Sequence, residues 1–335
     1  MTDDFESLWA NMQSQASGIK GGILRRRLTA ARDDGLFLGF DVSKRQRLFI
    51  IELAPHIQFR SWGTPHWREI EVERITEDVS PDIVIVKIAL ISERFSDVFT
   101  AFAYDLYKTL APLGKRPDVP YVLSERLEKW HRFFMTHGPA GLTQEEQLGL
   151  FGELWFLKHH VLGRMPALVA VKSWKGPEDR AHDFELPGGD IEAKVTGASE
   201  PRKLRISSEY QLDISSALSL YLYVASVEMK RSGGKTLPEL VSDLRIDIEE
   251  EKSGGDMFRQ KLMEAGYLDI HAGEYNTRYD VVEEFLFRVE EGFPRLTPVP
   301  EGVSGVRYML SLSACLKFQV DLDATLIPLL GGVQL

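Results

Sequence analysis

Hydrophobic positions in the first part of the chain recur at helical spacing, then at strand spacing, then at helical spacing again. Apolar residues three and four positions apart predict helices over 5–16 and 95–111. Between them, β-branched runs bounded by polar residues and proline predict strands over 47–53 and 82–90. This mixture predicts an α+β domain over residues 1–115.

The rest of the chain alternates between helical and strand patterns in blocks. A stretch rich in proline and charge, 112–120, precedes it, so we expect a second domain over 120–335. Helical periodicity covers 122–136, 143–162, 237–251 and 256–267. Strand-like runs cover 182–186, 190–196, 204–207, 218–227, 279–289 and 305–318. Helices, then strands, then helices and further strands predict an α/β fold with a mixed central sheet.

Composition narrows the class of protein. The 335 residues carry 40 Lys and Arg against 50 Asp and Glu, a formal net charge of −10, with 44% apolar residues. That apolar fraction is ordinary for a packed protein. The single cysteine, Cys315, excludes an intrachain disulfide framework and a cysteine-rich zinc site, and we expect it to be buried in a strand. No apolar run reaches the roughly 18 residues that span a bilayer, so we expect a cytoplasmic protein without a membrane partner.

The segment 174–196 carries the most informative pattern in the chain. Two strand-like runs flank Pro-Gly-Gly-Asp, and glycines supply the conformations that a tight hairpin needs. Centring the hairpin on the two glycines pairs Leu186 with Ile191, Glu185 with Glu192, and Asp183 with Lys194. Because side chains alternate across a strand, one face then carries the charged residues Asp183, Glu185, Glu192 and Lys194. The other face carries Phe184, Leu186, Ile191 and Ala193, which suits a core.

Carboxylates that face each other across a hairpin destabilise it unless something compensates their charge. A divalent cation would do so, and two carboxylates with a backbone carbonyl suit Mg²⁺. Asp183 and Glu192 are the candidate carboxylate ligands, and the carbonyl of Ala193 is a candidate third ligand. Such a metal can lower the pKa of a bound water and neutralise charge on a phosphoryl group. Lys194 would orient or help deprotonate that water and stabilise the anion.

These residues resemble a known family. Asp183, followed after eight residues by Glu192-Ala193-Lys194 on a hairpin, is similar to the PD-(D/E)XK nuclease superfamily, which includes type II restriction endonucleases. The preceding helix, which opens with a capping box from Thr143 to Glu146, carries Glu153 where the superfamily often has an additional metal-site glutamate. The residue before Asp183 is His182 rather than the proline of the superfamily's name.

An uncharacterised bacterial branch of the superfamily is similar over most of the chain. The shared stretches are Glu145-Glu146-Gln147, the run from Gly149 to Leu154, Trp174 ahead of Gly176-Pro177, His182-Asp183-Phe184, Ile191-Glu192 with Lys194, Ile206-Ser207-Ser208, Gln211-Leu212-Asp213 and Phe293-Pro294-Arg295-Leu296.

The resemblance implies a restriction-endonuclease-like core with a mixed central sheet flanked by helices, and an N-terminal accessory domain that contacts DNA or a partner. It implies a Mg²⁺-dependent DNA endonuclease, with Mn²⁺ as a substitute, in bacterial restriction or phage defence. Asp183 and Glu192 would bind the metal, Glu153 would assist, and Lys194 would position the attacking water. A homodimer or a second defence protein would be its partner besides DNA. Phosphate contacts would come from Arg202, Lys203, Arg205, Ser207 and Gln211.

Plainer interpretations remain open for each of these residues. Glu153 could face solvent, Lys194 could be an ordinary ion partner of Asp183, and the basic residues after the hairpin could form a solvated strand edge. The arginine run 25–27 is a second DNA candidate with the same alternative, and 62–67 (WGTPHW) is expected to form a satellite core. At the level of the whole protein, the alternatives are a catalytically inactive nucleic-acid-binding or scaffold protein on the same fold, and a phosphoesterase that acts on RNA or a small nucleotide.

Overall fold

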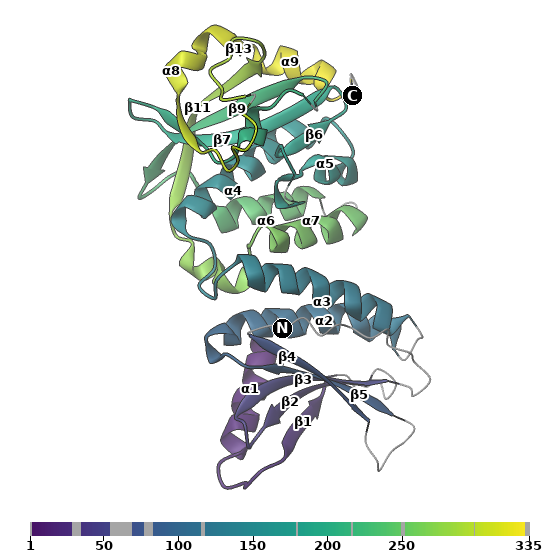
Figure 1. Cartoon of the computed structure of the whole chain (residues 1–335). Helices are drawn as coiled ribbons and strands as arrows, with labels where there is room; N and C mark the ends of the chain where they lie inside the picture. Colours follow the sequence, from purple (N-terminus) through teal and green to yellow (C-terminus); the bar gives the residue numbers. More distant parts are fainter. Residues whose placement is uncertain are drawn as a thin grey trace. The chain divides into compact units, whose positions relative to one another are not determined.

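The structure is a computed structural model, and it divides the chain into two compact units, Met1–Gly141 and Leu142–Leu335 (Figure 1). It describes residues 2–28, 35–53, 69–76, 83–114, 118–178, 180–215, 217–248, 252–297 and 299–331. The expected satellite core at 62–67 lies outside the described residues. Among the described helices, none is both long enough and apolar enough to cross a lipid bilayer.

The described residues of the first unit form an antiparallel sheet and three α-helices. Its strands run in the order β1-β2-β3-β5-β4. The strand bounds are β1 Ile23–Arg27, β2 Leu36–Asp41, β3 Gln46–Leu53, β4 Ile70–Thr76 and β5 Val84–Leu90. The helix bounds are α1 Thr2–Gln15, α2 Ser96–Leu110 and α3 Val119–Thr136. The first unit is therefore an α+β fold, as the sequence predicted.

The division between the units falls later than the stretch 112–120 in which we expected it. Helix α3 groups with the first unit because its apolar face packs on α2. The rings of Phe102 and Trp130 meet edge to face with centroids 5.3 Å apart. Asp105 of α2 also accepts a 2.9 Å hydrogen bond from Trp130 Nε1. The helices on either side of the proline-rich stretch thus pack together within the first unit.

The arginine run 25–27 lies on β1 at the end of the first sheet. Arg25 forms a 3.0 Å ion pair with Glu52, and the guanidinium of Arg27 lies 4.5 Å from the centre of the Phe37 ring. These two side chains therefore already have partners within the unit. Their expected contact with DNA stays a prediction.

The second unit has a six-stranded mixed sheet, as its alternating pattern predicted (Figure 1). The order is β10-β11-β9-β7-β6, with β13 pairing to β11; β7 and β9 are parallel and the other pairs antiparallel. The bounds are β6 Phe184–Leu186, β7 Gly189–Gly197, β9 Leu220–Lys230, β10 Lys235–Thr236, β11 Arg278–Val289 and β13 Gln319–Val320. A separate two-stranded sheet joins β8 Lys203–Ile206 to β12 Tyr308–Ser311.

Helices and the small sheet cover the two faces of this sheet. The helix bounds are α4 Gln144–Phe156, α5 Ala167–Ser173, α6 Leu237–Ile248, α7 Lys252–Glu264, α8 Leu312–Cys315 and α9 Leu322–Leu329. One core forms where Ile191 and Tyr223 pack with the residues of α4, α6 and α7. A second core, around Leu222 and Val224, lies on the opposite face with β8 and β12. The sheet is therefore covered by an apolar core on each face, and polar side chains on its central strands lie in apolar surroundings.

Two expected elements differ in the structure. The run 305–318, predicted as one strand, is strand β12 followed by the short helix α8, and a 3₁₀ turn at Leu316–Phe318 ends it. In an unbroken strand Leu310 and Leu312 would share a face and Cys315 would lie on the other, whereas the change to a helix brings all three into one core. The helix expected over 143–162 is α-helical only to Phe156 and continues as a π-helical turn, Leu157–Val161.

Cys315 is buried as expected, although it lies in α8. Burial raises the pKa of its thiol to about 12. Since the thiolate is the reactive form, the folded protein should not react with a thiol reagent below about pH 10. We expect stoichiometric reaction only in denaturant, measured by absorbance against a free-thiol standard. Rapid reaction of the native protein at neutral pH would contradict the buried position.

Candidate active site

Helix α4 brings Glu153 to the sheet. The helix begins at the predicted capping box: Thr143 accepts from the Glu146 amide at 3.3 Å, and Glu146 accepts from the Thr143 amide at 2.8 Å. One turn before its end, Gly152 faces β7 so closely that a β-carbon there would lie 2.2 Å from Val195 Cγ2. This close approach places the next residue, Glu153, beside the β6–β7 hairpin.

The hairpin forms in a register two residues away from the expected one. Phe184 pairs with Ile191, Glu185 with Asp190, and Leu186 with Gly189. The turn is therefore Pro187-Gly188, and Gly189 belongs to the strand. Gly189 has a φ of +154°, and a β-carbon there would lie 2.1 Å from Ser219 Oγ. A glycine is required here because the hairpin approaches Ser219, just before β9, so closely. The sequence pattern had assigned Gly189 to the turn.

A slip of two residues leaves every side chain on its predicted face, because strands repeat every two residues. Phe184, Leu186, Ile191 and Ala193 lie in the core with α4, as expected. The neighbouring Leu222 and Val224, which pair with Glu192 and Lys194, belong to the opposite core. The charged residues of β7 therefore share the face opposite α4.

The three candidate carboxylates and the lysine are each held by a specific contact. Asp183 Oδ2 accepts a 2.8 Å hydrogen bond from the amide of Ala193. Glu153 Oε2 accepts a 2.7 Å hydrogen bond from Trp174 Nε1. Lys194 lies 2.6 Å from Glu192 Oε1, so its closest ion partner is on its own strand and not across the hairpin at Asp183, as the expected register implied. Glu192 itself is 1% exposed.

Glu153 and Asp183 converge on the backbone of Gly176. A β-carbon at residue 176 would lie 2.3 Å from Glu153 Oε2 and 3.1 Å from Asp183 Oδ1. Both oxygens therefore lie within 3.1 Å of one point, although the residues come from a helix and from the start of a hairpin. The amides of Lys175 and Gly176 donate to the Asp183 carbonyl at 2.6 and 3.2 Å, which fixes the loop over the two carboxylates.

The cluster is buried and contains more carboxyl groups than positive charges. Burial, together with the charge of Asp183, raises the pKa of Glu153 to about 8, against the hydrogen bond from Trp174. Burial also raises the pKa of Asp183, and burial with the Asp183 charge raises the pKa of Glu192 well above its usual range. Burial lowers the pKa of Lys194, but Glu192 and Asp183 outweigh it, so the net shift is upward. One ammonium thus faces three carboxylates.

This donor set fits a hard divalent cation. The groups are carboxylate oxygens in a poorly solvated site, and their charge is only partly compensated by Lys194. Within the ranges that the structure describes, no three His, Cys, Asp or Glu side chains are arranged to enclose a metal ion. Mg²⁺ does not require such a cage, because it usually keeps several waters and binds one or two carboxylates. The expected carbonyl ligand, Ala193, contacts Asp183 through its amide.

Helix α7 supports the loop above the site through Lys261, a residue that the sequence analysis did not single out. Its side chain is 5% exposed, forms a 2.8 Å ion pair with Glu178 and donates to the carbonyl of Trp174. Lys261 lies between Phe258 and Leu262 on the buried face of α7. The sequence could have indicated this role, because Lys261 interrupts a stripe of apolar residues at helical spacing. The sequence analysis named Trp174 and Gly176 only among the stretches shared with the bacterial branch.

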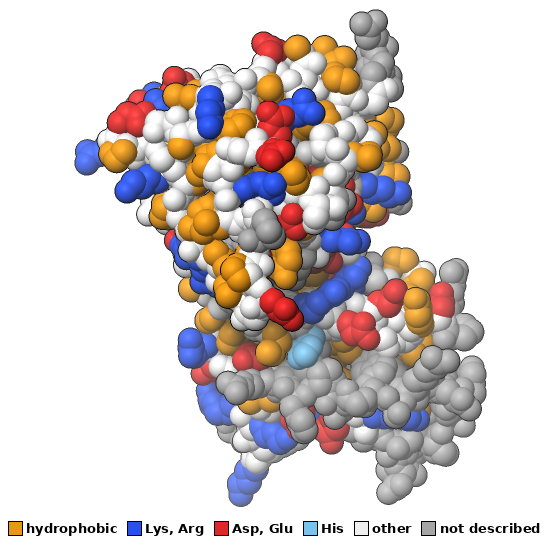
Figure 2. All heavy atoms as spheres, turned by 45° about the horizontal axis from the view of Figure 1, so that its top comes forward, with side chains coloured by type: hydrophobic (Ala, Val, Ile, Leu, Met, Phe, Trp, Pro, Cys, Tyr) orange, Lys and Arg blue, Asp and Glu red, His pale blue; other side chains and the backbone are white. Residues whose placement is uncertain are grey.

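The expected phosphate-binding residues lie on and around β8. Lys203 and Arg205 are both exposed, since side chains alternate along the strand. Arg205 forms a 2.6 Å ion pair with Glu145. Arg202 is only 15% exposed at its side chain and is paired with Glu283 and Glu200. On the face of the second unit seen in Figure 2, basic and acidic side chains are interspersed.

Two further candidates are engaged with each other. Gln211 Oε1 accepts a 2.7 Å hydrogen bond from the Ser207 amide, which closes the turn after β8. This contact uses the acceptor of Gln211 and the backbone donor of Ser207. The proposed phosphate contacts of these two residues stay predictions.

A mixed sheet with an acidic hairpin, an E-x-K strand and a glutamate on the preceding helix defines a restriction-endonuclease-like core of the PD-(D/E)XK class. The chain belongs to the family DUF4420, described as "Putative PD-(D/E)XK family member", whose model matches residues 5–313. Members of the PD-(D/E)XK superfamily are generally nucleases that use divalent metals. No curated protein and no solved structure matches the chain.

Proposed function

We propose that this protein is a metal-dependent DNA endonuclease whose active site comprises Asp183, Glu192, Lys194 and Glu153. The observation that carries the proposal is the buried Glu192–Lys194 ion pair on the strand whose Ala193 amide holds Asp183. Strand β7 and the residue that precedes β6 thereby bring two carboxylates and an ammonium together beside the hairpin. This is the arrangement needed to neutralise and attack a phosphodiester.

Each side chain has a distinct task in this proposal. Asp183, Glu192 and Glu153 would hold Mg²⁺, or Mn²⁺ in its place, with the Ala193 carbonyl as a further ligand. The bound cation supplies charge neutralisation at the phosphodiester and acidity for a water. Trp174 orients the Glu153 carboxylate, and the Ala193 amide orients that of Asp183. Lys194 is cationic beside Glu192, so it can orient the water and stabilise charge on the phosphate.

Supercoiled plasmid incubated with Mg²⁺ tests the proposal. We expect wild-type protein to nick or linearise it, and Asp183→Asn, Glu192→Gln and Lys194→Met each to lose at least about 100-fold in rate, the lower end of what a positioned acid or base contributes. Glu228→Gln, an exposed carboxylate on β9, is the matched control and should cleave like wild type. Melting temperatures of all variants establish that they are folded.

Other outcomes would favour other functions. Equal cleavage by wild type and the three variants would place the active site elsewhere. Mg²⁺ binding measured by calorimetry, with cleavage of RNA but not of plasmid, would favour a phosphoesterase for another substrate. Neither binding nor cleavage would favour a non-catalytic scaffold. The setting that we propose, bacterial restriction or phage defence in the cytoplasm, rests on the family resemblance, and plaque counts on cells with wild-type or Lys194→Met protein test it.

The partners in this proposal are DNA and either a second copy of the chain or another defence protein. Cutting both strands at one position requires two active sites, or two successive nicks by one. The exposed Lys203 and Arg205 would contribute phosphate contacts, together with Arg202, Ser207 and Gln211. The first unit would act as an accessory DNA or partner domain.

A further inference from the structure

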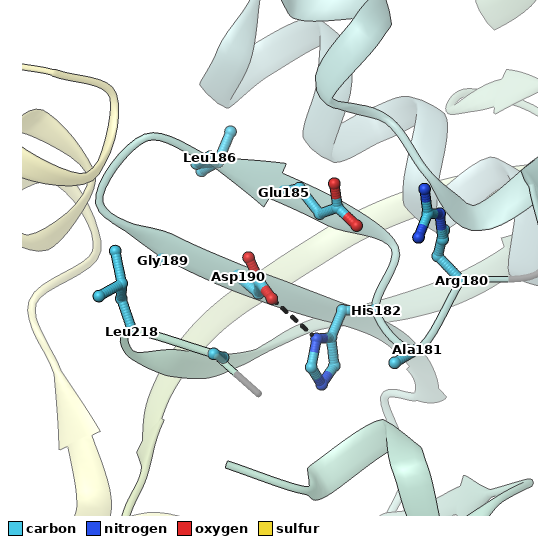
Figure 3. Close-up of a pocket in the computed structure, with 9 residues that line it drawn as sticks. Arg180, Ala181, His182, Glu185, Leu186, Gly189, Asp190 and Leu218 are labelled. Carbon is cyan, nitrogen blue, oxygen red and sulfur yellow. Dashed lines mark hydrogen bonds and ion pairs between the residues drawn. The ribbon is translucent and has the colours of Figure 1, made fainter. Parts of the chain in front are cut away.

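A hollow of about 420 Å³ opens beside the proposed active site, on the β6–β7 hairpin (Figure 3). This volume falls within the range of about 300–1,000 Å³ that is typical of small-molecule sites. The residues that give it its chemistry are Arg180, His182, Glu185, Asp190 and Leu218. None of them has a task in the proposed cleavage reaction.

The two carboxylates of the hollow are placed side by side by the hairpin register. Glu185 pairs directly with Asp190, so both side chains emerge from the same face of the hairpin. Asp190 accepts a 3.0 Å hydrogen bond from Nδ1 of His182, whose ring is 3% exposed. The buried imidazole fixes Asp190, whereas Glu185 is exposed (Figure 3). The hollow therefore has a pair of hydrogen-bond acceptors with one member held rigidly.

The hollow is also close to the proposed cleavage residues along the strand. Asp190 precedes Glu192 by two positions, so both project from the same face of β7, roughly 7 Å apart along the strand. DNA rises about 3.4 Å per nucleotide. A group bound in the hollow would therefore belong to a nucleotide within about two steps of the phosphodiester at Glu192.

The charges of the hollow select against thymine and adenine. Glutamate and aspartate accept hydrogen bonds from the N4 amino group of cytosine, whereas thymine presents the O4 acceptor there and would be repelled. Arg180 is exposed at the mouth, and its forked donors match the adjacent N3 and O2 acceptors of cytosine. Adenine has one acceptor on each side of its amino group, N1 and N7, but no two adjacent acceptors for the fork. Guanine offers its N1 and N2 donors to the carboxylates and its adjacent O6 and N7 acceptors to the fork. Leu218, 90% exposed at the rim, offers an apolar surface to the face of a base.

We propose that the hollow is a base pocket that takes an unstacked cytosine or guanine of the DNA substrate, next to the phosphodiester that Asp183 and Glu192 address. The proposal rests on the proposed nuclease function and deepens it by assigning a sequence preference. Glu185 and Asp190 bind the amino group, Arg180 binds the opposite edge, and His182 positions Asp190.

Fluorescence anisotropy with short single-stranded oligonucleotides tests the pocket. The full-length protein is titrated in Ca²⁺ against labelled oligo-dT, and against the same strand with one central dC or one central dA. We expect the dC strand to bind about tenfold more tightly than the other two, as one good pair of base contacts provides. Glu185→Leu and Arg180→Met should each abolish this ratio. Leu218→Ser should weaken binding of the dC strand.

The control is Glu290→Leu, which removes an exposed carboxylate at the end of β11 and should keep the tenfold preference for dC. Cleavage of supercoiled plasmid is followed separately in Mg²⁺. Plasmid cleavage together with equal affinity for the three strands would overturn the pocket and leave the nuclease proposal intact. A dC preference that depends on Glu185, without plasmid cleavage, would overturn the nuclease proposal and leave the pocket as a binding site. Equal or absent binding of all three strands in the wild type overturns the pocket.

Discussion

Gly152→Ala is expected to destabilise the protein by about 1–2 kcal/mol, although alanine is the better helix former. The added methyl group would lie 2.2 Å from Val195 Cγ2, where the β-branched side chain of a sheet strand has little freedom to move. Overpacking typically costs about 1–3 kcal/mol, and the gain in helix propensity returns at most about 1 kcal/mol. Helix α4 would have to move away from β7.

Gly149→Ala, on the same helix, is the matched control. A β-carbon there meets nothing within 4 Å, so only the propensity gain remains and the variant should be up to about 1 kcal/mol more stable than wild type. Urea unfolding followed by circular dichroism measures both. Opposite signs for the two alanines establish the close packing of α4 on β7. If both variants are stabilised, the helix does not approach the strand as described.

Gly176→Ala should abolish the proposed cleavage while leaving the protein folded. Its methyl group would fall 2.3 Å from Glu153 Oε2, the atom that also accepts from Trp174. The carboxylate is at the end of a flexible side chain and can move, so stability should change little. A displacement of about 1 Å at a catalytic group can cost roughly 100-fold in rate, and we expect at least this loss in the plasmid assay.

Gly197→Ala is the control for this effect, since Gly197 ends the strand that carries Glu192 and a β-carbon there meets nothing within 4 Å. It should cleave like wild type. Magnesium titration by calorimetry gives a second measurement, because displacement of Glu153 should weaken cation binding in Gly176→Ala alone. Wild-type cleavage and Mg²⁺ affinity in Gly176→Ala would remove Glu153 from the proposed site.

Alternation along strands let the sequence predict which side chains share a face, but it did not predict their partners. The hairpin slipped by two residues, which preserved the faces and changed the pairs. Gly188 and Gly189 look equivalent in the sequence, yet only the fold shows that Gly189 is needed against Ser219. Because the register was ambiguous, the sequence paired Lys194 with Asp183 across the hairpin. Its ion partner in the structure is Glu192, at 2.6 Å.

Contacts between distant segments lay beyond the sequence pattern altogether. The amphipathic period of α3 predicted a helix correctly, but nothing in it showed that its apolar face would meet α2. Likewise, Lys261 reaches the Trp174 carbonyl across a gap of 87 residues in the chain. Such contacts depend on how helices pack, and local periodicity carries no information about which helix is the neighbour.

The parallel pairing of β7 with β9 bears on how this protein is made. Antiparallel β6 contributes three residue pairs to β7, whereas β9 pairs with it from Asp190 to Gly197. The partner residues, Leu220–Val227, leave the ribosome after β7 does, and β9 itself is completed by β11, about fifty residues later still. A nascent chain that ends before β9 therefore carries the acidic residues without the sheet that holds them together. On the proposed function, newly synthesised molecules stay harmless to the cell's own DNA until β9 and β11 have been made.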